Sequence, residues 1–281
     1  MFTLNCKGQL LVIDKPVVMG IINTTPDSFF EGSRKESAAA IVKQAALMLE
    51  EGAGMIDIGG QSTRPGSTPV SEEEELARVI HGIDAIHRQF PACIISVDTY
   101  YARVAKEAVE AGASIVNDIS AGSLDPLMIE TVAALRVPYV LMHMQGRPQT
   151  MHQAPHYDQV TREVLDFFIT RLAELQRAGI TDVIVDPGFG FGKTIAHNFE
   201  LLDQLPAFRI LQKPLLAGLS RKGTVYKTLS TTAENALNGT TVLNTIALMN
   251  GASILRVHDV KAAVEAVILV GKISSGINTG Q

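Results

Sequence analysis

The stretch Val17-Val-Met-Gly-Ile-Ile22 is a short apolar run rich in β-branched residues, and Met55-Ile-Asp-Ile58 is a second such run. Between them, Ser37–Glu51 carries apolar residues at helical spacing, which predicts a helix. Two short strands joined by a helical crossover predict a parallel βαβ unit.

The same alternation continues outward to the end of the chain. Strand-like runs follow at Ile94–Val97, Ser114–Val116, Pro138–Met142, Val183–Val185, Pro214–Ala217 and Ser253–Val257. Helical segments follow at Ser71–Gln89, Ala102–Glu110, Pro126–Ala134, Tyr157–Ala178, Asn198–Leu205, Ala233–Asn250 and Val260–Ile273. Eight strand–helix units predict an α/β fold, a closed (β/α)8 TIM barrel rather than an open doubly wound sheet.

The residues ahead of the first strand predict an N-terminal β-hairpin. Thr3–Asp14 has Lys7-Gly8 at its turn, and we expect this hairpin to plug the bottom of the barrel. Because no linker or low-complexity segment divides the chain, we expect one domain over residues 1–281. Ser71, with Glu74 three residues on, predicts a capping box at the start of its helix.

Composition narrows the class of protein. The chain has 281 residues, 46% of them apolar, and a net charge of -5. This apolar content excludes disorder, and the acidic balance argues against a nucleic-acid partner. No apolar run is long enough for a membrane span, and two cysteines are too few for a disulfide framework. We therefore expect a cytoplasmic protein with small-molecule partners.

Polar side chains follow every predicted strand. In chain order they are Asn23, Asp57, Thr63-Arg64, Asp98, Asn117-Asp118, His143, Asp186, Ser220-Arg221-Lys222, Arg256 and His258. In a (β/α)8 barrel these groups converge on the carboxyl-terminal face, where active sites of this fold lie. Their convergence predicts an enzyme.

These groups fall into two chemical sets. Arg64, Arg256 and His258 are cationic, and Asn23 and Thr63 are neutral hydrogen-bonding partners, a combination that predicts a phosphate or pyrophosphate ligand. A magnesium ion bridged by that pyrophosphate needs few protein ligands and stays an open alternative, whereas no group of residues has zinc-ligand spacing.

The second set consists of Asp98, Asn117 and Asp186. Two carboxylates and an amide fit a planar heterocycle with N–H donors, such as a 2-amino-pyrimidinone edge. An equally open alternative is that Asp98 and Asn117 cap the next helix or fix a turn. For His143 and His258 a structural role is favoured over catalysis, because a lone histidine at a strand end is more often a structural side chain.

The segment Gly188-Phe-Gly-Phe-Gly-Lys-Thr194 resembles a phosphate-binding P-loop but fails its spacing by one residue. The following residues, Ile195–Glu200, also form a poor helix opening, which argues against nucleotide hydrolysis. Phe189 and Phe191 more plausibly offer flat apolar surface beside a bound ring, or ordinary loop packing.

Several blocks together resemble the dihydropteroate synthase family. They are Met19-Gly-Ile-Ile-Asn-Thr-Thr-Pro-Asp-Ser-Phe29, Gly60-Gln-Ser-Thr-Arg-Pro-Gly66, Ser96-Val-Asp-Thr99, Asn117-Asp-Ile119, Leu141-Met-His-Met144, Asp186-Pro-Gly-Phe-Gly-Phe-Gly-Lys193, Ser220-Arg-Lys222 and Arg256-Val-His-Asp259. The blocks keep the family's order along almost the whole chain. The resemblance implies a cytosolic, homodimeric barrel of folate biosynthesis and a target of sulfonamides. It implies condensation of 6-hydroxymethyl-7,8-dihydropterin diphosphate with para-aminobenzoate, giving dihydropteroate and pyrophosphate with Mg²⁺.

The resemblance also implies roles for individual residues. The pterin would contact Asp98, Asn117, Met142, Asp186 and Lys222. The diphosphate would contact Asn23, Thr63, Arg64, Arg256 and His258, with Asn23 near the metal. The para-aminobenzoate pocket would use Thr63, Pro65, Phe191, Ser220 and Lys222. The implied catalytic set is Asp98, Lys222, Asp186 and Arg256.

The resemblance further implies that the loops Thr24–Ser33 and Gly59–Thr68 close over the site, and that the seventh and eighth helices form the dimer contact. The chain departs from the family pattern at Gln61, at Phe30-Glu31-Gly32 and at Gly223-Thr-Val-Tyr226. Two other functions stay open: a pterin-binding barrel that transfers a methyl group to a corrinoid protein, and an inactive barrel that only binds.

Overall fold

Eight parallel strands form the centre of the computed structural model, which describes residues 1–24, 34–61, 70–148, 150–151 and 155–277. The sheet order is β8-β7-β6-β5-β4-β3-β10-β9, and a parallel bridge between Val185 and Leu215 joins its two ends. The strands are β3 (Val17–Asn23), β4 (Met55–Gly59), β5 (Ile94–Asp98), β6 (Ile115–Asp118), β7 (Tyr139–Met142), β8 (Val183–Asp186), β9 (Leu216–Ala217) and β10 (Ile254–Val257). The predicted closed (β/α)8 barrel is confirmed.

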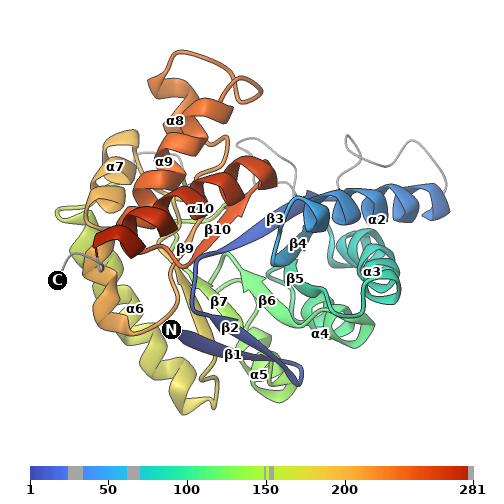
Figure 1. Ribbon diagram of the computed structural model, residues 1–281. Coiled ribbons are helices and arrows are strands. Elements are labelled where there is room, and N and C mark those ends of the chain that lie inside the picture. The colour runs from blue at the N-terminus through green and yellow to red at the C-terminus, as the bar shows by residue number, and fades with distance from the viewer. Residues whose placement is uncertain (25–33, 62–69, 149, 152–154, 278–281) are drawn as a thin grey trace.

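Helices surround the strands on the outside (Figure 1). They are α2 (Arg34–Glu50), α3 (Glu72–Gln89), α4 (Ala102–Ala111), α5 (Met128–Leu135), α6 (Val160–Arg177), α7 (Ile195–Asp203), α8 (Gly223–Thr228), α9 (Leu237–Met249) and α10 (Val260–Ile277), with a 3₁₀ helix at Leu205–Leu211. Apolar side chains of helices and strands pack between the two layers and form the larger core.

The N-terminal hairpin closes the bottom of the barrel, as predicted. Strands β1 (Phe2–Cys6) and β2 (Gln9–Ile13) pair antiparallel, and Lys7 and Gly8 have φ values of 55° and 90° at the turn. Both residues of such a tight turn need positive φ. Leu4 and Leu11 pack against residues near the amino-terminal ends of the barrel strands, and the amide of Asn5 donates to Asp182 Oδ2 at 2.9 Å.

Strand register brings the carboxyl ends together. Asn23 is level with Gly59, Gly59 with Asp98, and Asp98 with Asn117. On the next strands Met142 is level with Asp186. Because parallel strands end at the same edge, polar residues far apart in the sequence lie side by side at the mouth of the barrel.

Three predicted elements differ in the structure. The expected helix Ala233–Asn250 is present in shorter form as α9, Leu237–Met249, and a further short helix, α8, precedes it at Gly223–Thr228. The strand predicted over Pro214–Ala217 shortens to Leu216–Ala217. Helix α7 begins at Ile195, because Thr194 accepts the His197 amide at 3.1 Å and His197 Nδ1 accepts the Thr194 amide in return. The judgement that this segment is a poor helix opening was therefore wrong.

At the start of α3, the predicted N-cap is confirmed, since Ser71 Oγ accepts the amide of Glu74 at 3.3 Å. The carboxylate of Glu74 instead pairs with Arg78, at 2.5 Å.

Candidate active site

Four polar side chains meet at the carboxyl ends of β4, β5, β6 and β10. Arg256 donates from Nε to Asp57 Oδ2 at 2.6 Å and from Nη2 to Asp98 Oδ2 at 2.5 Å. Asn117 Nδ2 lies 3.2 Å from the same Asp57 oxygen. Asp57 is fully buried, whereas the Arg256 side chain keeps 17% of its surface exposed at the mouth. The residues of this cluster come from strands up to 199 positions apart in sequence.

The electrostatics of this cluster follow from burial and neighbouring charge. Burial raises the pKa of Asp98 to about 7, although the Arg256 guanidinium lowers it. Burial opposes the charge of Arg256, but Asp57 and Asp98 more than compensate and raise its pKa. A carboxylate with a raised pKa beside a fixed cation is typical of functional sites.

A second polar pair lies across the mouth. Burial raises the pKa of Asp186, against the effect of Lys222, and the amide of Gly188 donates to Asp186 Oδ1 at 2.7 Å. Burial lowers the pKa of Lys222 to about 8, against the effect of Asp186. The Lys222 ammonium donates to the Phe189 carbonyl at 2.6 Å and lies 4.7 Å from the centre of the Phe191 ring.

An apolar patch lies beside these charges. Met142 and Phe191 are buried together with Ile119 and Met151, and Tyr100 and Met144 pack against them. The patch offers flat apolar contact to a ring held by the neighbouring polar groups. Phe189, by contrast, is fully buried in the main core, so its side chain has the ordinary packing role given as the alternative above. Only its backbone carbonyl contacts the site, through Lys222.

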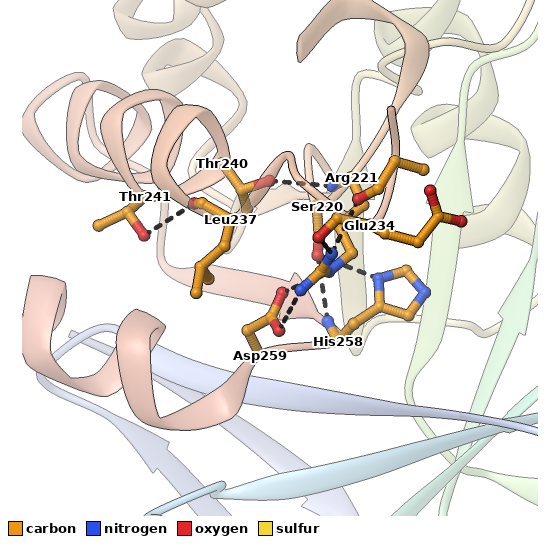
Figure 2. A network of polar contacts seen from close by, with 9 residues as sticks. Ser220, Arg221, Glu234, Leu237, Thr240, Thr241, His258 and Asp259 are labelled. Atoms are coloured by element: carbon orange, nitrogen blue, oxygen red, sulfur yellow. Dashed lines mark hydrogen bonds and ion pairs between the residues drawn. The ribbon is translucent and has the colours of Figure 1, made fainter. Parts of the chain in front are cut away.

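Ser220 and His258 form the third part of the mouth (Figure 2). Ser220 Oγ accepts the His258 amide at 3.2 Å and lies 3.0 Å from His258 Nδ1. The position of Arg221 between Ser220 and Lys222 predicted that it would also face the site. In the structure its side chain points away from the site. Its guanidinium turns to Asp259, with Nε and Nη2 each 2.8 Å from a carboxylate oxygen.

Three of the predicted site residues, Thr63, Arg64 and Pro65, lie outside the described residues, as does most of both predicted closing loops. Asn23 ends β3 and is half-buried. The next residue, Thr24, donates from its amide to the Gly59 carbonyl at 2.9 Å, which fixes the start of the first loop.

Sequence reasoning did not assign Lys193 or pair Asp57 with Arg256. The Lys193 ammonium is buried within 3.2 Å of His143 Nδ1 and of the carbonyls of His143, Gly188 and Phe191. Burial lowers the pKa of Lys193 to about 7 and that of His143 to about 3, so His143 Nδ1 accepts. Because its ammonium group is held by these acceptors, Lys193 is not available to bind a phosphate. The segment therefore does not form a P-loop.

A tight approach explains the glycine in this loop. Gly188 has a φ of 71°, and a Cβ there would lie 1.9 Å from the His143 carbonyl oxygen.

The sequence signal that could have identified Lys193 is its place directly after three alternating glycines. Asp57 carried a weaker signal, because a carboxylate inside an apolar strand needs a partner.

Another buried network involves Gln61, which follows β4. The side-chain amide of Gln61 donates from Nε2 to the carboxyl group of Glu75, which is fully buried. The Tyr100 hydroxyl donates to Gln61 Oε1 at 2.9 Å. Burial raises the pKa of Glu75 to about 7. The glutamine that departs from the family pattern thus supplies a donor to a buried carboxyl group.

Comparison with known proteins agrees with this geometry. The sequence pattern of the family described as "Pterin binding enzyme" matches residues 19–258. The chain is therefore a pterin-binding enzyme built on a (β/α)8 barrel.

Its relatives narrow the class further. The dihydropteroate synthase of Escherichia coli (strain K12) is 46% identical over 266 residues, which cover 94% of each chain. The solved structure of Xanthomonas albilineans dihydropteroate synthase with 4-aminobenzoic acid has a TM-score of 0.90 at 44% identity, covering 97% of this chain and 98% of that one. The same enzyme with 7,8-dihydropteroate has a TM-score of 0.87 at 41% identity, covering 97% and 99%. The chain belongs to the dihydropteroate synthase family, transferases of folate biosynthesis.

Proposed function

We propose that this chain makes 7,8-dihydropteroate at the mouth of its barrel. The substrates are 6-hydroxymethyl-7,8-dihydropterin diphosphate and para-aminobenzoate, and the second product is pyrophosphate. The observation that carries the assignment of residues is the buried cluster of Asp57, Asp98, Asn117 and Arg256, with Asp186 and Lys222 across the mouth.

The pterin ring is assigned to the polar groups of β5, β6 and β8. Asp98 and Asp186 accept its N–H groups, Asn117 and Lys222 contact its edge, and Met142 lies against its face. Two observations support this: each carboxylate is buried at the mouth, and Met142 belongs to the apolar patch beside them. The ring donors then replace the Arg256 Nη2 group at Asp98, which leaves Arg256 free to turn toward the diphosphate.

The diphosphate is assigned to the cationic side. Arg256 and His258 lie on β10 and just after it, and Asn23, Thr63 and Arg64 complete the set. Charge-assisted hydrogen bonds from Arg256 stabilise the negative charge that develops on the leaving group.

The residues at the diphosphate side fit a magnesium ion whose other ligands come from the substrate phosphates. Within the residues that the structure describes, no group of three acidic, histidine or cysteine side chains is placed to hold a metal ion. Mg²⁺ needs few protein ligands when substrate phosphates supply the others, so Asn23 would hold it through its amide oxygen. When bound, the ion would neutralise charge on the departing pyrophosphate.

The amine is assigned to the side of β8 and β9. Ser220, Lys222 and Phe191, with Thr63 and Pro65, position para-aminobenzoate so that its nitrogen faces the pterin methylene carbon. The C–O bond breaks and pyrophosphate leaves with the electron pair, while the amine forms the C–N bond and then loses a proton. Asp98 and Asp186 place negative potential near the positive charge of the pterin, and positioning contributes more than a strong base would.

The exposed surface of the last two helices, α9 and α10, supports a homodimer that forms through them. Large apolar side chains are exposed on α9 and α10, which pack against each other. They are Leu237, Val242, Ile246, Met249, Ile268, Leu269 and Ile273. An apolar face of this kind marks an association surface, and its occupant here is a second copy of the chain. Sedimentation of the wild type and of a Met249→Lys, Leu269→Lys variant tests this, and a wild-type monomer would contradict it.

Assay of the purified protein with both substrates and Mg²⁺ tests the function, with dihydropteroate detected by chromatography. Product should disappear when the amine or the metal is omitted. Asp98→Asn should abolish turnover, and Asp84→Asn, which removes an exposed carboxylate of α3 that pairs with Arg88, is the matched control. Pterin binding without product would overturn the synthase function, and binding of a corrinoid would then point to methyl transfer.

No helix in the described part of the chain is long and apolar enough to cross a membrane.

A further inference from the structure

Strand β9 is held by fewer backbone contacts than its neighbours. Its two residues pair with Ile254 and Leu255 of β10, and only the bridge from Val185 to Leu215 connects this side to β8 within the described chain. Every other strand of the barrel sheet has at least four residues. The segment 220–222 lies beyond the last paired residue of β9, so the sheet does not fix its position.

The Arg221 side chain contacts four acceptors on two other segments. Its Nε and Nη2 groups contact the two Asp259 carboxylate oxygens at 2.8 Å each, where β10 leads into α10. Its Nη1 group donates to the carbonyls of Ala233 at 2.8 Å and Glu234 at 2.5 Å, between α8 and α9. Figure 2 shows the guanidinium between Asp259 and this connection. The planar donor arrangement of arginine suits such a site, and lysine cannot reproduce it.

The backbone of Arg221 is fixed as well. Its amide donates to Thr240 Oγ1 of α9 at 3.0 Å, and its φ of 52° is uncommon for a residue other than glycine. Three separate segments therefore hold one residue. We call Arg221, Asp259 and the carbonyls of Ala233 and Glu234 the Arg221 clamp.

The neighbours of Arg221 serve the site. Ser220 Oγ contacts His258, and the Lys222 ammonium contacts the Phe189 carbonyl. Asp259 directly follows His258, so the same ion pair restrains both the segment after β9 and the segment after β10.

We propose that Arg221, acting through Asp259, is a positioning residue that holds Ser220 and Lys222 at the para-aminobenzoate end of the site. The inference rests on the proposed function, because the roles of Ser220 and Lys222 are those proposed above. Arg221 itself touches no substrate. Its loss should therefore harm use of the amine more than binding of the pterin.

Kinetics provide the first test. Arg221→Met should raise KM for para-aminobenzoate at least about tenfold, because small displacements of positioning groups have large effects on rate. The Kd of the pterin without its diphosphate, measured calorimetrically without the amine, should change less than about threefold, since Asp98, Asn117 and Asp186, three of its four proposed polar contacts, lie on other strands. Arg221→Lys should fall between Arg221→Met and the wild type.

A matched control is available on the outer surface. Arg103 also pairs with carboxylates between α3 and α4, those of Glu72, Glu73 and Glu107. Arg103→Met should leave both constants unchanged. An unchanged KM for the amine in Arg221→Met, or an equal loss for both substrates, would overturn the proposal.

Hydrogen exchange separates this inference from the function. In Arg221→Met, amides of residues 216–223 should exchange at least about tenfold faster, whereas those of β5 and β6 should not change. This readout needs no turnover, so a wild type that makes no dihydropteroate would contradict the function alone. Unchanged exchange in 216–223 would overturn the clamp.

Asp259→Asn provides a milder variant, should Arg221→Met fail to fold. It keeps the contacts of Arg221 with the two carbonyls, so a rise of about threefold in KM for the amine is expected. Asp259→Asn combined with Arg221→Met should be no worse than Arg221→Met alone, since both act through one contact. Additive effects of the two substitutions would contradict an action through Asp259.

Discussion

On one side of the barrel mouth, Asp57, Asp98 and Asn117 lie within strands β4, β5 and β6, and on the other side Ser220 and Lys222 lie beyond the two-residue strand β9. The first group is held by strand register and by Arg256. The second group is held by the Arg221 clamp and by contacts of the side chains themselves. The pterin side therefore inherits its geometry from the sheet, whereas the amine side depends on a few side-chain bonds. A substitution should affect whichever substrate its side of the mouth serves.

The largest effect is expected from Asp98, assigned to the pterin, and from Lys222, assigned to both the pterin and para-aminobenzoate. Asp98→Ala and Lys222→Ala should each lower kcat about 10³-fold while the barrel stays folded, because each removes charge stabilisation in a buried site. Steady-state assays with circular dichroism check both parts. Wild-type rates in either variant would remove that residue from its role.

Arg256→Ala is expected to act on the diphosphate. Binding of the pterin diphosphate should weaken about 100-fold, because charge-assisted hydrogen bonds to the leaving group are lost. Binding of the pterin without its diphosphate should weaken much less. Calorimetric titration with both ligands measures the difference, and equal losses would contradict the anion-binding role.

Activity should depend on pH through one group from each side. Asp98 must be ionised to accept N–H groups, so kcat/KM should fall about tenfold per unit as pH drops below its pKa of about 7. Lys222 must be protonated, so kcat/KM should fall again above its pKa of about 8. A pH profile of kcat/KM checks this, and Lys222→Arg should move the alkaline limb upward. A flat profile would contradict both assignments.

Asp57→Asn tests whether the two sides of the mouth act independently. It weakens the ion pair with Arg256 while an amide oxygen can still accept from Asn117, so kcat/KM for the pterin substrate should fall about tenfold. The KM of para-aminobenzoate should stay constant, the reverse of the result expected for Arg221→Met. If both variants changed the same constant, the two sides would not be independent.

The smallest effect on turnover is expected at the far end of the barrel. Leu4→Ala removes a buried side chain of the hairpin and should lower the free energy of unfolding by about 3 kcal/mol. Because the hairpin covers the opposite end from the site, kcat should stay within about twofold of the wild type. Denaturant unfolding and a rate assay check the two statements, and a large loss of kcat would show that the two ends are coupled.

Sequence reasoning reached the barrel because strand and helix periods are local properties. The run Val17–Ile22 and its successors appear as strands, and Lys7-Gly8 turns the hairpin as predicted. It also selected Asp98, Asn117, Asp186, Lys222 and Arg256, which the structure brings to one mouth. It failed near β9, where a two-residue strand and the additional short helix α8 depend on contacts between distant segments.

The amino-acid sequence was enough to predict the order of strands and helices, the hairpin, the family and the residue types available for chemistry, since each is encoded in local pattern or in motifs. Which charges pair became visible only in the folded barrel. Arg256 bonds to Asp57 across 199 positions, Lys193 is buried among carbonyls, and Arg221 turns from the site to Asp259. The physical reason is that a side chain's partners depend on where the closed barrel places segments distant in sequence, and spacing along the chain carries no record of that placement.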